Sequence, residues 1–95
     1  MKQMKITVRY MAQIKKMVGS SEEVFEISGS MTAQVFIAQH LCQQYVHLTE
    51  YLIEKDGSLC KTILIFHGDE QIDSNLAKKL QDGDVLTLIP PITGG

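Results

Sequence analysis

The carboxyl-terminal part of the chain decides its fold, and it reads Asp82-Gly83-Asp84-Val85-Leu86-Thr87-Leu88-Ile89-Pro90-Pro91-Ile92-Thr93-Gly94-Gly95. The first three residues are a sharp turn signal, and the apolar run over 85–89 predicts a strand. Pro90 ends this strand because proline has no N–H to donate to a ladder. The stretch therefore predicts a last strand and a tail, within one domain over 1–95 whose flexible tail covers 90–95.

The tail carries an unusual reactive group. Its two prolines hold φ at about −65° and favour an extended path away from the body. The four residues after Pro91 reach roughly 13–14 Å when fully extended, and Gly-Gly is thin enough to enter a narrow channel. We therefore expect the α-carboxylate of Gly95 to be the working group. The alternative is that the tail is a disordered stub or a tag remnant.

Outward from the last strand, hydrophobic periodicity predicts alternating strands and helices. In chain order these are a strand over 4–11, a helical turn over 12–18 that stops at Gly19, a strand over 22–27, the main helix from Ser30 or Thr32 to Tyr45, a short helix or ordered loop over 46–58, a strand over 59–66, a short strand over 70–72 and a helical turn over 75–80. This order indicates an α+β fold: one mixed sheet with the main helix packed across one face. We expect the first and last strands to be adjacent in its centre.

The main helix is predicted to bury one apolar stripe against the sheet. Its members are Val35, Ala38, Leu41, Cys42 and Tyr45, with Phe36 and Ile37 widening it. The second strand is less regular, because Val24 and Ile27 cannot share one face of a strictly alternating strand.

Composition excludes several classes of function. A hydrophobic fraction of 44% can supply one core, while a net charge of −2 and a single arginine, Arg9, argue against a nucleic-acid partner. The sequence shows neither a secretory signal nor a stretch of about 18 apolar residues, so we expect no membrane association. Cys42 and Cys60 lack a CxxC spacing, which favours reduced structural thiols in a cytoplasmic protein.

The side chains predict no conventional active site. His40, His47 and His67 are too widely spaced for a zinc site, so we expect surface histidines and no metal. A Cys–His nucleophile is disfavoured because both cysteines fall on apolar periods that predict burial. Four acids, Asp69, Glu70, Asp82 and Asp84, are expected to be solvated turn residues.

The remaining reactive group is the carboxylate of Gly95. A carboxylate is a poor electrophile at neutral pH and needs activation, for example as an acyl-adenylate. The chain has no nucleotide-binding loop of its own. A separate enzyme would therefore have to activate Gly95.

With these residues in view, the chain resembles the ubiquitin-like β-grasp sulfur carriers, and in particular the small subunit of molybdopterin synthase (MoaD-like). The most specific likeness is the Asp82–Asp84 turn, the strand after it and the ending Pro90-Pro91-Ile92-Thr93-Gly94-Gly95, since such proteins characteristically end Pro-Pro-Val-Thr-Gly-Gly. The stretch Tyr10-Met11-Ala12-Gln13 with Val18-Gly19, and the helix led by Thr32, are also similar to the family.

The resemblance implies a ubiquitin-like β-grasp fold and a chemistry in which this chain supplies no catalytic side chain and binds no cofactor. An E1-like adenylating enzyme would use ATP to adenylate Gly95, and sulfur transfer would leave a thiocarboxylate. The tail, Pro90 to Gly94, would insert into the large subunit of molybdopterin synthase within a heterotetramer. The thiocarboxylate would there donate sulfur to a cyclic pyranopterin, in molybdenum cofactor biosynthesis.

The resemblance also implies an apolar sheet surface that docks both partners. The candidates are Tyr10, Met11, Phe66, Leu88 and Ile89, each of which could instead be an ordinary core side chain. The chain departs from the family at three places. It has Phe66-His67-Gly68 where the family often has an Asn-Gly turn, and Leu88 and Ile89 where aromatic residues are common. Its segment over 46–58 is also longer than usual.

These departures leave the pathway open. The same fold could carry sulfur for thiamine thiazole, tRNA thiolation, cysteine or a tungsten cofactor, or could be conjugated to protein lysines. A β-grasp interaction domain with an inert tail is a further alternative.

Overall fold

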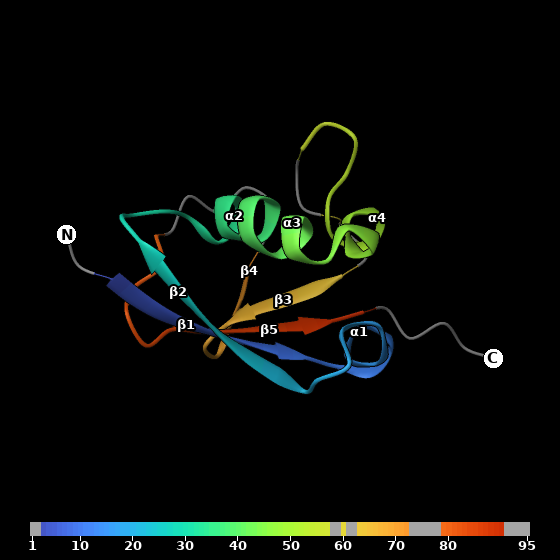
Figure 1. Cartoon of the computed structure of the whole chain (residues 1–95), viewed down its shortest axis with the longest axis horizontal. Helices are drawn as coiled ribbons and strands as arrows, with labels where there is room; N and C mark the ends of the chain where they lie inside the picture. Colours follow the sequence, from blue (N-terminus) through green and yellow to red (C-terminus); the bar gives the residue numbers. More distant parts are fainter. Residues whose placement is uncertain (1–2, 58–59, 61–62, 73–78, 91–95) are drawn as a thin grey trace.

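The strands of the computed structural model form one mixed sheet (Figure 1); the structure describes residues 3–57, 60, 63–72 and 79–90. Within these ranges the strands are β1 (Gln3–Tyr10), β2 (Glu22–Ser28), β3 (Leu64–His67), β4 (Glu70–Ile72) and β5 (Val85–Ile89). Their order across the sheet is β2-β1-β5-β3-β4. The predicted strand over 59–66 is therefore shorter and ends one residue later, and the predicted short strand over 70–72 is confirmed.

The first and last strands are adjacent, as predicted. β1 and β5 run parallel, with Tyr10 opposite Leu88, and β5 lies in the middle of the sheet. The other neighbouring pairs, β1–β2, β3–β5 and β3–β4, are antiparallel. A parallel pair needs a long crossover, and here the chain between β1 and β5 supplies it.

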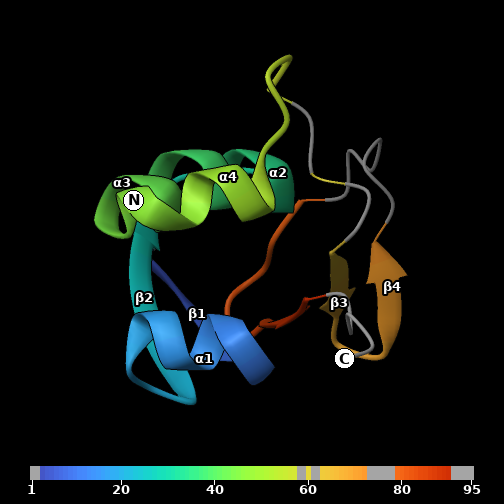
Figure 2. The ribbon, with the colours of Figure 1, turned by 90° about the vertical axis from the view of Figure 1, so that its right-hand side faces the viewer.

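The helical segments lie in two places. α1 (Ala12–Val18) follows β1 and ends at Gly19, whose φ is 88° and whose N–H donates to the carbonyl of Lys15 at 2.8 Å. This confirms the predicted glycine stop. After β2 come α2 (Ala33–Phe36), a π-helical turn (Ile37–Leu41), α3 (Cys42–Gln44), a 3-10 turn (Val46–Leu48) and α4 (Thr49–Leu52). α2, α3 and α4 lie together on one side of the sheet, and α1 lies beside the end of β5 (Figures 1 and 2).

The main helix begins where the sequence predicted, but its buried stripe differs. Thr32 caps it: its Oγ1 accepts the N–H of Val35 at 3.2 Å. The side chain of Val35 is 37% exposed, which corrects its assignment to the stripe. The buried side chains are Ala33, Phe36, Ile37, Leu41 and Cys42.

The π-helical turn explains the difference. The N–H of Cys42 donates to the carbonyl of Ile37, five residues earlier, so the turn holds one residue more than an α-helical turn. The extra residue shifts the buried face by one position, so that Phe36 and Ile37, and not Val35, are buried on the same side as the predicted Leu41 and Cys42. The periodicity of a regular α-helix could not show this shift.

The side chain of Val24 on β2 points to the open side of the sheet, so β2 alternates regularly. Phe25 and Ile27 are buried, whereas Val24 is 58% exposed. They join inward side chains of β1, β3 and β5, which alternate as a sheet covered on one side requires. This core also contains Tyr10 and Leu88, at 1% and 0% exposure.

The segment after the main helix contains α4 and then the turn expected at Asp56-Gly57. Nε2 of Gln34, on α2, donates to the carbonyl of Gly57 at 3.0 Å and holds this turn against the helix. The helical turn predicted over 75–80 falls mostly on residues outside those described. Among the described helices none is long and apolar enough to cross a membrane.

Candidate functional site: the open sheet face and the root of the tail

The sheet face opposite the helices is apolar along β3 and β5. Leu64 pairs with Ile89, and Phe66 pairs with Thr87, in the antiparallel register. Leu64 is 40% exposed, and Phe66, Val85 and Ile89 are half-buried. Their strand neighbours Ile65, Leu86 and Leu88 are buried in the core. We call Leu64, Phe66, Val85 and Ile89 the apolar face.

The same side of the sheet is charged along β1 and β2. Lys5 lies opposite Glu26 and Arg9 lies opposite Glu22. Nε of Arg9 is 3.7 Å from Oε2 of Glu22, with both side chains 57% exposed, so this pair contributes little stability. The charged pairs leave β3 and β5 as the part of the open sheet suited to apolar docking.

Three of the predicted partner residues keep exposed surface. Met11 is 42% exposed, and Phe66 and Ile89 are half-buried, so they could contact a partner. The prediction is wrong for Tyr10 and Leu88, because both side chains face the helices and are buried. The cause is strand alternation, which points Tyr10 and Leu88 to the same covered face as Val8 and Leu86.

The root of the tail is part of the folded body. Pro90 follows β5 directly and is buried, which places it with the domain and not with the predicted flexible tail. The other residues of the predicted tail, Pro91, Ile92, Thr93, Gly94 and Gly95, lie outside the described residues. The geometry therefore defines where the tail starts: at the end of the central strand, beside the apolar face.

A strained corner lies next to this root. The N–H of Met11 donates to the carbonyl of Leu88 at 3.2 Å. Ala12 follows with a φ of 49°, in the left-handed region that costs an L-residue about 1–2 kcal/mol. The chain thereby leaves β1 and enters α1 within one residue.

A carboxylate that the sequence did not single out holds the main helix to the sheet. Oε1 of Glu23, on β2, accepts the hydroxyls of Tyr10 at 3.1 Å and Tyr45 at 2.6 Å, and its Oε2 accepts Nε2 of Gln44 at 2.8 Å. Burial, followed by the charge of Glu23, raises the pKa of Tyr10 well above its usual range. Burial and the hydrogen bond to Glu23 also raise the pKa of Tyr45. These residues are distant in sequence, so no local pattern could reveal the cluster.

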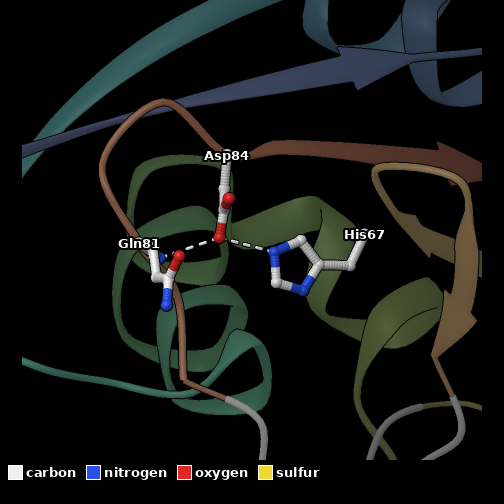
Figure 3. A network of polar contacts seen from close by, with 3 residues as sticks. All are labelled: His67, Gln81 and Asp84. Atoms are coloured by element: carbon white, nitrogen blue, oxygen red, sulfur yellow. Dashed lines mark hydrogen bonds and ion pairs between the residues drawn. The ribbon is translucent and has the colours of Figure 1, made fainter.

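A second polar contact corrects the surface placement of His67 and Asp84 (Figure 3). The imidazole of His67 is 8% exposed, and its Nε2 lies 2.5 Å from Oδ2 of Asp84, whose side chain is 23% exposed. The same oxygen accepts the N–H of Gln81 at 2.7 Å. Alternation along β3 turns His67 to the covered side with Ile65. Its Nδ1 is buried and has no hydrogen-bond partner among the described residues.

The remaining candidate side chains are the two cysteines and the other two histidines. Cys42 is buried, and burial raises the pKa of its thiol, whereas Cys60 is half-buried. His40 is half-buried and stacks on Phe36, with ring centroids 5.4 Å apart. His47 is exposed, as predicted. The described part of the chain contains no group of three or more His, Cys, Asp or Glu side chains that could hold a metal ion.

The strand order and the helices across one face of the sheet define a ubiquitin-like β-grasp domain. A model of the ThiS family matches residues 8–95. The chain therefore belongs to the ThiS family of ubiquitin-like sulfur carriers, as its resemblance implied.

Individual relatives agree with this assignment. The chain is 26% identical over 92 residues to the molybdopterin synthase sulfur carrier subunit of Chlamydomonas reinhardtii, covering 97% of this chain and 100% of the relative. It is 32% identical to a chain in the complex of subunits 1 and 2 of the molybdopterin-converting factor from Helicobacter pylori 26695, with a TM-score of 0.56 and coverage of 97% and 100%. The crystal structure of SAMP1 from Haloferax volcanii shares the fold, with a TM-score of 0.82, 22% identity and coverage of 96% and 99%.

Proposed function

We propose that this chain is the sulfur carrier subunit of a molybdopterin synthase. The observation that carries the proposal is the match, over 97% of the chain, to a chain of the Helicobacter pylori converting-factor complex. The relative in Chlamydomonas reinhardtii bears the corresponding name. The apolar face next to the root of the tail supports it, because a carrier of this kind must dock on a larger partner while its terminus reaches inside.

The proposed reaction takes place at the carboxylate of Gly95. An E1-like enzyme joins the carboxylate to the AMP part of ATP and releases pyrophosphate. A sulfur nucleophile, such as hydrosulfide, then attacks the acyl carbon, and AMP leaves with the C–O bond electrons. The product is a thiocarboxylate in which one oxygen has been replaced by sulfur.

The large synthase subunit would receive this thiocarboxylate. The apolar face, with Met11 at its edge, would contact that subunit, and the tail would carry the sulfur to a cyclic pyranopterin. We propose that the two kinds of subunit form a heterotetramer in the cytoplasm. Neither the synthase step nor the activation step needs a cofactor bound to this chain.

Intact mass spectrometry tests the proposal. The protein is incubated with ATP, hydrosulfide and its cognate E1-like enzyme, and we expect a gain of about 16 Da, the difference between sulfur and oxygen. The thiocarboxylated protein is then mixed with the large subunit and the pterin precursor, and we expect the mass to return to its starting value as dithiolene forms. A chain without Gly95 should show no gain, with a nearly unchanged melting temperature.

Two results would redirect the proposal. An unchanged mass with an enzyme that activates another carrier would leave an interaction domain as the remaining role. Sulfur loading without transfer in the presence of the large subunit would point to another pathway of the same family, such as thiazole, cysteine or tRNA thiolation.

A further inference from the structure

The parallel hydrogen-bond ladder between β1 and β5 ends with the bond from Met11 to Leu88. The N–H of Thr7 donates to the carbonyl of Asp84 at 3.0 Å, and the N–H of Met11 donates to the carbonyl of Leu88 at 3.2 Å. In a parallel ladder, the residue that donates to one position accepts from the residue two positions further on. The next bond would therefore run from an N–H at position 90 to the carbonyl of Met11.

That carbonyl is already occupied. The oxygen of Met11 accepts the N–H of Ile14 at 3.1 Å and the N–H of Lys15 at 3.4 Å, which are the first bonds of α1. The φ of 49° at Ala12 turns the following residues so that the N–H groups of Ile14 and Lys15 meet this oxygen. An N–H at position 90 would compete for the same oxygen, but Pro90 has none.

We propose that Pro90 is a positioning residue for the tail. Its missing N–H ends the pairing of β5 with β1 at Leu88 and reserves the carbonyl of Met11 for α1. Position 90 thereby offers no donor through which the pairing with β1 could extend toward the tail. The positioning role rests on the sulfur-carrier function proposed above, whereas the ladder geometry does not.

The proposal differs from a packing role for the proline ring. Pro90 is buried, so replacing it also removes ring contacts. A test must therefore change the N–H without changing the side chain. Two variants do so: Pro90→Ala, and Pro90→N-methylalanine, which has the same side chain but no N–H. Both can be made by native chemical ligation at Cys60, which joins a 1–59 thioester to a synthetic segment over 60–95.

Amide hydrogen exchange tests the ladder directly. In the Pro90→Ala chain we expect the new amide at position 90 to be protected about five-fold by a bond to Met11, the factor expected for one ordinary hydrogen bond. The amides of Ile14 and Lys15 should lose protection by a similar factor because they share the acceptor. In the N-methylalanine chain they should exchange as in the wild type. An unprotected amide at position 90, with unchanged exchange at Ile14 and Lys15, would overturn the proposal.

Kinetics test the positioning role. If the new bond lowers the fraction of chains with an unpaired tail about five-fold, only that smaller fraction can bind the activating enzyme. The KM for this chain in the ATP-dependent activation reaction should then rise about five-fold, with kcat unchanged. The N-methylalanine chain should keep the wild-type KM. Equal KM values for the two variants would overturn the positioning role. If wild-type chain accepts no sulfur, the proposed function fails, while the exchange pattern still decides the role of Pro90 in the ladder.

Discussion

Asp84→Ala should destabilise the domain far more than the removal of an ordinary turn residue. The substitution removes the acceptor that lies 2.5 Å from Nε2 of His67. The imidazole is only 8% exposed, and its Nδ1 has no hydrogen-bond partner among the described residues. It also removes the acceptor for the N–H of Gln81 at 2.7 Å. A buried polar group left unpaired costs about 1–3 kcal/mol. Because Asp84 is 23% exposed and water can reach part of the site, we expect a loss of about 2–3 kcal/mol in total.

Urea unfolding followed by far-UV circular dichroism measures this loss, and a melting temperature lower by roughly 8–24 °C should accompany it. Asp69→Ala is the matched control: Asp69 is an exposed acid in the β3–β4 turn, and its loss should change stability by less than about 0.5 kcal/mol. His67→Leu and the double variant complete a thermodynamic cycle. We expect a coupling energy of about 1–3 kcal/mol between the two substitutions, because a leucine at position 67 no longer needs the carboxylate of Asp84 as a hydrogen-bond acceptor. A coupling of zero, or an Asp84→Ala loss as small as that of Asp69→Ala, would refute the reasoning.

Three other changes give further tests. Ala12→Gly should stabilise the domain by up to about 1 kcal/mol in urea unfolding, since glycine adopts a positive φ without strain; a loss would mean that the corner is not strained. The pKa of Tyr10 is raised in the folded state. The protonated hydroxyl therefore contributes fully to the free energy of unfolding below about pH 10, and this contribution is lost as the pH rises above that value. Unfolding measured from pH 9 to 12 should show this loss, and Glu23→Gln, which removes the neighbouring charge, should make it less steep. Leu64→Lys should weaken binding of the large synthase subunit about ten-fold or more without changing the fold, whereas Val24→Lys, on the charged half of the sheet, should bind as the wild type does in calorimetry.

The fold was predictable because local signals agree with the global arrangement. Alternation defined β1, the glycine at position 19 ended α1, and the turn over 82–84 with its apolar run defined β5. The stripe of the main helix was less predictable, because a π-helical turn at Ile37–Leu41 changes the period and the sequence contains no mark for it. At that point Phe36 and Ile37 are buried, whereas Val35 is 37% exposed.

The open sheet face was predictable only in part, since Phe66 and Ile89 lie on it whereas Tyr10 and Leu88 face the helices. Half-buried residues on alternating strands, such as Phe66 and Ile89, can be assigned to the open face once the strands are known. Contacts between residues far apart in sequence cannot, and the pair His67–Asp84 shows why. Each residue alone is typical of a solvated turn. Alternation along β3 turns the imidazole inward, and the register of β3 against β5 places it near Asp84.

The position of β5 in the sheet has a consequence for how a partner is recognised. β5 is held by β1 on one side and β3 on the other, and Pro90 at its end is buried, so the tail starts from a fixed point. Five residues follow Pro90, and fully extended they span at most about 17–18 Å. A partner that docks on Leu64, Phe66 and Ile89 must therefore place its reactive centre within that distance of the end of β5. Under the proposed function, the apolar face and the length of the tail would act together, so a partner that bound the apolar face in a different orientation would miss the carboxylate even if its affinity were unchanged.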